Sequence, residues 1–227
     1  ALVLLTTICA GIGSLISRKT RTRALPVLLA FGMTSALILA DAMTGSNLCK
    51  YCGVTSYQLS GLRFYGIGNE FAGVLIGMSA ALALLLPKRG LAVPLIGIVV
   101  IVTLGLGHFG ANYGETAAAA MTFGLLWFAA SRKGFGAWHV ALAFAAAIAA
   151  YVMFALIDMF IAGPAGTHAA RVTGLTQNLG AGFLSSTLVR KMALNLKYTF
   201  TIGLRVFLAF VPFLAIWFWK VRGKVQT

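Results

Sequence analysis

The stretch Arg63–Gly73, with the sequence RFYGIGNEFAG, stands at the boundary between a polar segment and a long apolar run. It places an arginine, an asparagine and a carboxylate within eight residues, at the edge of an otherwise apolar segment. Ionisable residues at membrane depth are costly and tend to mark function. We therefore expect this stretch to lie where an outer loop ends and a membrane-spanning helix begins, and to carry part of the chemistry.

The composition around this stretch is that of an integral membrane protein. Of the 227 residues, 60% are hydrophobic and 10% are charged, whereas about a quarter of the residues of a soluble domain are charged. Glycine- and alanine-rich runs without strand alternation predict helices, because only helices and closed barrels satisfy their backbone groups in lipid. The sequence therefore predicts an all-α bundle, one transmembrane domain of residues 1–227, with about seven spans at 1–17, 24–42, 68–86, 91–108, 113–131, 137–162 and 201–219.

The chain begins inside an apolar run, without an initiator methionine or a basic leader. This indicates a fragment of a longer chain, or a chain that starts after a cleavage.

The distribution of charge predicts how the bundle is oriented. The formal net charge is +14, and the basic residues concentrate in the loops after the first, third and fifth spans and in the tail after the seventh. The positive-inside rule makes that side cytoplasmic. We expect a multi-pass protein of the cell membrane with its N-terminus outside, its C-terminus in the cytoplasm, and the bilayer and its anionic lipids, not nucleic acid, as partners.

In this topology all four acidic residues of the chain lie near the outer face. They are Asp41, Glu70, Glu115 and Asp158. Glu70 and Glu115 follow similar stretches, Gly66–Asn69 and Gly110–Gly114, which combine glycines with an asparagine ahead of a helix. Helix capping and close packing explain such patterns structurally, since a first-turn carboxylate interacts well with the helix dipole. The functional interpretation makes Glu70, Glu115 and Asp41 catalytic candidates, with Arg63, Asn69, His108 and Asn112 as substrate-binding residues.

Two outer segments are polar, the loop 43–67 and the segment 163–200. The loop contains Cys49 and Cys52, for which we favour a disulfide in an oxidising compartment; unpaired thiols and a redox or metal site remain alternatives. The second segment predicts an amphipathic helix lying in the interface. It serves as a lid or anchor, or it binds a phosphate headgroup through His168, Arg171, Arg190 and Lys191.

Several of these motifs resemble a family of poorly characterised bacterial multi-spanning membrane proteins. The similar stretches are Arg63–Glu70, Gly110–Gly114, Thr167-His168 and Arg190–Asn195. In that family the membrane bundle is often fused to an extracytoplasmic domain resembling the alkaline phosphatase superfamily, and no such domain is present in these residues. The resemblance covers roughly 63–200 and implies a membrane bundle with this domain, or another protein, as a partner. It implies no particular activity, cofactor or metal.

Three functions are compatible with the sequence. The first is a cell-envelope enzyme, or its membrane half, acting at the outer face on a lipid-linked or phosphate-bearing substrate. The second is a transporter or flippase, because glycine-interrupted helix starts with polar groups are found at transport sites. The third is a non-catalytic membrane subunit that scaffolds a larger complex. The sequence leaves open whether the protein is an enzyme, and favours the first function.

Overall fold

The computed structural model describes residues 7–8, 11–15, 25–52, 66–131 and 135–162, and positions 182, 185, 186, 189, 193 and 212. The chain divides into two compact units, Ala1–Arg171 and Val172–Thr227. Most of the predicted span at 1–17, and all but isolated positions of the segment 163–200 and of the span at 201–219, lie outside the described residues. The helices below all belong to the first unit.

The described part of the first unit is all-α and contains no strand. Its long helices are α2 (Leu25–Met43), α4 (Asn69–Leu85), α5 (Arg89–Gly105), α6 (Tyr113–Ala130) and α7 (Ala137–Ala162). These bounds confirm the helices predicted at 24–42, 68–86, 91–108, 113–131 and 137–162. Within the described part of the predicted loop 43–67, the structure contains a four-residue helix, α3 (Asn47–Lys50). A single turn is too short to give a periodic apolar pattern, so the sequence did not reveal it.

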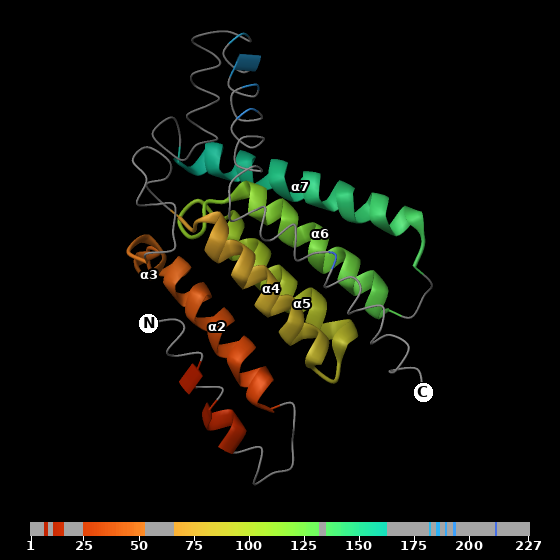
Figure 1. The fold of residues 1–227 in the computed structure, drawn as a ribbon. Coiled ribbons are helices and arrows are strands. Elements are labelled where there is room, and N and C mark those ends of the chain that lie inside the picture. The colour runs from red at the N-terminus through yellow and green to blue at the C-terminus, as the bar shows by residue number, and fades with distance from the viewer. Residues whose placement is uncertain are drawn as a thin grey trace. The chain divides into compact units, whose positions relative to one another are not determined.

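Helices that follow one another in the chain pack side by side: α2 on α4, α4 on α5, α5 on α6, and α6 on α7 (Figure 1). The connections after α4, α5 and α6 are short, which makes successive helices antiparallel. The end of α2, the start of α4, the turn between α5 and α6 and the end of α7 therefore meet at one end of the bundle. We call this the acidic end, because Asp41, Glu70, Glu115 and Asp158 occupy these four helix ends.

The core lies among α2, α4, α5 and α6. Its fully buried apolar residues include Ile38, Leu75, Val93, Val100 and Leu104. One polar contact crosses this core, the hydrogen bond from Ser79 Oγ of α4 to Ser35 Oγ of α2 at 3.0 Å. Such a pair satisfies two hydroxyl groups that burial would otherwise leave without water.

Two of the described helices, α2 and α7, are long and apolar enough to cross a membrane. In the most apolar windows of these helices only 28% and 17% of the residues are buried inside the protein. Most side chains of α7 are exposed, whereas more of those of α2 are half-buried than exposed. Phe160 near the end of α7, for example, is 81% exposed. The helices α4 and α5 are apolar but shorter, with 17 residues each.

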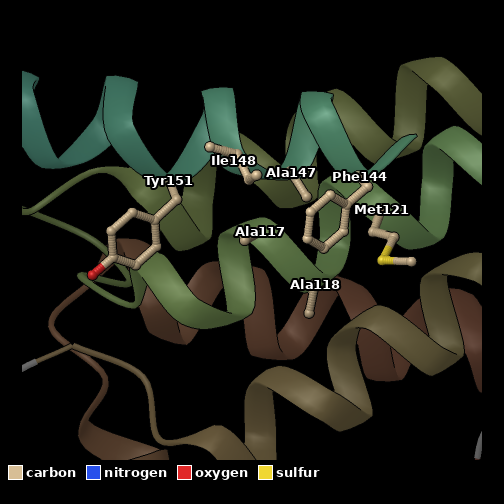
Figure 2. Close-up of a pocket in the computed structure, with 7 residues that line it drawn as sticks. All are labelled: Ala117, Ala118, Met121, Phe144, Ala147, Ile148 and Tyr151. Carbon is tan, nitrogen blue, oxygen red and sulfur yellow. The ribbon is translucent and has the colours of Figure 1, made fainter. Parts of the chain in front are cut away.

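A pocket of about 300 Å³ lies between α6 and α7 (Figure 2). Its lining consists of small and large apolar side chains together with Tyr151: Ala117, Ala118, Met121, Phe144, Ala147 and Ile148. No charged side chain lines it. The pocket therefore offers space for apolar groups, and the four acidic side chains of the chain lie elsewhere, at the acidic end.

Candidate functional site

The two similar stretches of the sequence meet in the structure. The Ile67 N–H, just before α4, donates a hydrogen bond to the Gly110 carbonyl oxygen, just before α6, at 2.8 Å. This bond joins the start of α4 to the turn that leads into α6, and we call the contact the α4–α6 junction. The resemblance between the two stretches thus corresponds to a direct contact between them.

Glycine is required at both sides of this junction. Gly66 has a φ of +71°, a left-handed conformation that residues with a Cβ adopt at a cost. A Cβ on Gly66 would also collide with the Gly110 carbonyl group. A Cβ on Gly110 would lie 2.6 Å from the Thr103 carbonyl oxygen and from the Leu104 Cα. The two backbones approach this closely because neither glycine carries a side chain.

Asn112 is the centre of the junction. It precedes α6, is 5% exposed, and donates through Nδ2 to the Ile67 carbonyl oxygen at 3.1 Å and to Asn69 Oδ1 at 3.0 Å. Its Oδ1 accepts the Glu115 N–H at 3.3 Å, which caps α6 in the usual manner of an asparagine. One buried amide therefore connects the start of α4, the side chain of Asn69 and the first turn of α6.

The two glutamates lie on either side of this amide. Glu70 is exposed in the first turn of α4, directly after Asn69. Glu115 is half-buried in the first turn of α6, where its own N–H is bound by Asn112. Both positions place a carboxylate near the positive end of a helix dipole. The structure thus brings the starts of the helices that carry Glu70 and Glu115 together around the pair Asn69 and Asn112.

Asp41, the third catalytic candidate, is bound to backbone groups of α3. It is 6% exposed at the end of α2, and its carboxylate accepts the N–H groups of Leu48 at 2.8 Å and of Cys49 at 3.0 Å. These are N–H groups of α3, which helix geometry leaves without a partner inside the helix. The Asp41 carbonyl oxygen also accepts the Ser46 N–H at 2.6 Å. Asp41 therefore holds α3 against the end of α2.

We expect Asp41→Asn to lower the free energy of unfolding by about 2 kcal/mol, because it removes a charged acceptor from two backbone N–H groups. Thr44→Val is a matched control in the same turn, since Thr44 Oγ1 donates to the exposed Ala40 carbonyl oxygen. Denaturant titration of both variants in detergent, followed by circular dichroism, measures the difference. Equal effects of the two substitutions would contradict the capping role of Asp41.

The predicted disulfide is not formed in the structure, where Cys49 and Cys52 are thiols. Cys49 is 2% exposed and its backbone N–H is bound by Asp41, whereas Cys52 is half-buried. Burial, together with the hydrogen bond and the negative charge of Asp41, raises the pKa of the Cys49 thiol. The Asp41 contact thus accounts for a buried thiol at this position without a disulfide.

The remaining predicted site residues are not part of the junction as described. His108 is exposed in the turn between α5 and α6. Five predicted binding residues lie outside the described residues: Arg63, His168, Arg171, Arg190 and Lys191. Within the described part of the chain, no group of three or more His, Cys, Asp and Glu side chains is placed to hold a metal ion.

Sequence reasoning missed two features of the junction. Ile67 is fully buried and contributes its backbone N–H and carbonyl group, so no side-chain pattern identifies it. Thr103, 1% exposed on α5, presents its carbonyl oxygen to the Gly110 N–H at 2.8 Å, while its own hydroxyl has no hydrogen-bond partner in the structure. In the sequence, Thr103 is a single hydroxyl residue in an apolar helix. Many structural roles fit such a residue, so the sequence did not identify Thr103 as part of a site.

We compared the chain with models of known protein families, with curated proteins and with solved structures, and none of the three comparisons finds a match.

Proposed function

We propose that the chain is the membrane bundle of a cell-envelope enzyme, with its site at the acidic end and Glu70 as the acting carboxylate. The observation that carries this proposal is the position of Glu70. Its side chain is exposed, and it follows directly on a junction whose backbone and side-chain groups are hydrogen-bonded to one another. A reactive group is positioned best when it projects from a rigid support.

The membrane location of this bundle rests on several observations together. The helices α2 and α7 are long enough to cross a bilayer, and α4, α5 and α6 have 17, 17 and 18 residues, close to the shortest helices that span the hydrocarbon core. Exposed apolar side chains along α7 favour contact with lipid. Lys88, in the turn before α5, and Arg89, the first residue of α5, are exposed at the opposite end from the acids, which favours a cytoplasmic position for that end.

Within the proposed site, Glu70 acts as a general base or as a metal ligand, and Glu115 is its partner. We assign the partner role to Glu115 because Asn112 binds the first turn of its helix, while both carboxylate oxygens of Asp41 are occupied by α3. The substrate is lipid-linked or carries a phosphate. Arginine and histidine side chains predicted from the sequence, Arg63, His168 and Arg171, would bind the anionic group.

We expect Glu70→Gln to reduce turnover about 100-fold or more, the usual contribution of a general base. Because Glu70 is exposed, the free energy of unfolding should change by no more than about 0.5 kcal/mol. Native mass spectrometry of the protein in its own lipids identifies the substrate class, as an anionic lipid or lipid-linked glycan that wild type holds and the variant loses or traps. Arg89→Gln, an exposed change of charge at the opposite end, is the matched control.

A different result would favour a second function. The hydrogen bonds of the junction would also be expected if the contact between α4 and α6 were purely structural. The exposed apolar side chains of α7 are suited to binding a partner protein. If Glu70→Gln and wild type carry the same bulk lipids and the same co-purifying protein, the site argument fails. The chain is then a membrane subunit that scaffolds a larger complex.

A further inference from the structure

The short segment after α2 contains two cysteines in different environments. Cys49 lies in α3, is 2% exposed, and its backbone N–H donates to the Asp41 carboxylate at 3.0 Å. Cys52 lies two residues beyond α3 and is half-buried. Both side chains pack against the apolar core that includes Ile38, Ile67 and Phe71. The two thiols are therefore neighbours on one short loop, one shielded and one reachable from the surface.

We propose that Cys49 and Cys52 form a reversible thiol–disulfide pair that reacts with a low-molecular-weight disulfide, with Cys52 as the attacking thiol and Cys49 as the resolving thiol. The order of attack follows from access, since an approaching disulfide meets the half-buried sulfur before the shielded one. This inference rests on the contacts of α3 alone. It goes beyond the proposed function and does not depend on Glu70.

The reaction balances in two exchange steps. The Cys52 thiolate attacks one sulfur of the disulfide, forms a mixed disulfide and releases the other half as a thiolate. The Cys49 sulfur then attacks the Cys52 sulfur of the mixed disulfide, and the Cys49 proton passes to the thiolate released in the first step. The second half leaves as a thiolate, so that the protein loses two electrons and two protons and the substrate becomes two thiols.

The contacts of Asp41 explain why α3 keeps its position in both the thiol and the disulfide form. In the thiol form its carboxylate accepts the backbone N–H groups of Leu48 and Cys49. Because both bonds come from backbone groups, oxidation of the sulfur leaves them in place. The α3 turn therefore remains attached to α2, and the pair can be oxidised and reduced without unfolding.

The test uses glutathione disulfide as the probe, with the full chain in detergent and Cys9→Ala as the background, because Cys9 is the third cysteine of the chain. Intact mass spectrometry after oxidation should show the background protein losing the mass of two hydrogen atoms, which dithiothreitol restores in the folded state. Adding Cys49→Ser should leave one stable glutathione adduct. Adding Cys52→Ser should slow adduct formation about tenfold or more relative to Cys49→Ser.

Asp41→Asn in the same background tests the resolving step. Because Asp41 holds the backbone of Cys49 in place, the substitution should lengthen the life of the glutathione adduct without changing the rate at which the adduct forms. Circular dichroism shows whether Asp41→Asn has opened the loop instead. The rate of Cys49 alkylation in the Asp41→Asn, Cys52→Ser double variant tests the same point. If the loop has opened, the adduct data from Cys49→Ser and Cys52→Ser decide whether the proposal holds.

Three outcomes would overturn the proposal. Equal rates of adduct formation in Cys49→Ser and Cys52→Ser would remove the difference in access. A glutathione adduct that persists in the background protein would show that Cys49 does not resolve it. A disulfide that dithiothreitol reduces only after the protein is unfolded would identify a permanent structural staple.

Discussion

Replacing Gly66 with alanine is expected to lower the free energy of unfolding by about 3 kcal/mol, through backbone strain and overpacking together. Gly66 has a φ of +71°, where an L-residue with a Cβ is strained. Its new methyl group would also collide with the Gly110 carbonyl group, which is backbone and has no rotamer to change. The junction must open to accommodate it, and the bond between Ile67 and Gly110 is lost in doing so.

Gly73→Ala is the matched control for this prediction. Gly73 lies within α4, and no atom comes within 4 Å of a Cβ added there. Alanine at this position should leave stability unchanged or raise it by up to about 1 kcal/mol, because it is the better helix former. Denaturant titration in detergent, followed by circular dichroism, compares the two variants. Shifts of the same sign and size would show that the starts of α4 and α6 are not in tight contact.

Asn112→Ala is expected to lower the free energy of unfolding by a similar amount, about 3 kcal/mol, for a different reason. It removes the buried donor that serves the Ile67 carbonyl oxygen and Asn69 Oδ1, and also the cap of α6. The Ile67 carbonyl group then stays buried without this donor. Asn69→Ala loses a single side-chain contact on an exposed residue and should cost only about 1 kcal/mol.

The double variant separates these contributions. If the amides of Asn69 and Asn112 interact as described, the cost of the two substitutions together should be smaller than the sum of the single costs by the energy of their hydrogen bond. Unfolding titrations of the four proteins in the cycle give this coupling energy. A cost of Asn112→Ala no greater than that of Asn69→Ala would contradict the central position of Asn112 in the junction.

The helices were predictable because particular residue types mark where each helix begins or ends. The apolar run of α4 stops at Pro87, and that of α6 begins after Asn112, so the predicted bounds agree with the structure to within a few residues. The gathering of the four acids at one end also followed from the sequence, since an up-and-down order of helices places alternate ends together. Residues beyond 162 are described only at isolated positions, so the predicted amphipathic segment stays a prediction.

The site was less predictable, because its contacts join distant parts of the chain. Asn69 and Asn112 are 43 residues apart, and their likeness in sequence does not reveal that one amide donates to the other. Asp41 illustrates the same difficulty. An acid at a helix end was reasonably considered catalytic, but its partners are backbone N–H groups of a helix only one turn long. Backbone donors carry no residue type, so the sequence could not indicate them.

The contact between Asn112 and the Ile67 carbonyl has a consequence for how the protein is made. The two groups are separated by 45 residues, and the whole α4–α5 hairpin lies between them. During synthesis this hairpin leaves the ribosome before Asn112 does, so the Ile67 carbonyl oxygen receives its hydrogen bond from Asn112 only after α4 and α5 have been made. Arrival of Asn112 then closes the hairpin at the same moment as it begins α6. The α4–α6 junction is therefore completed only when the first residues of α6 have been synthesised.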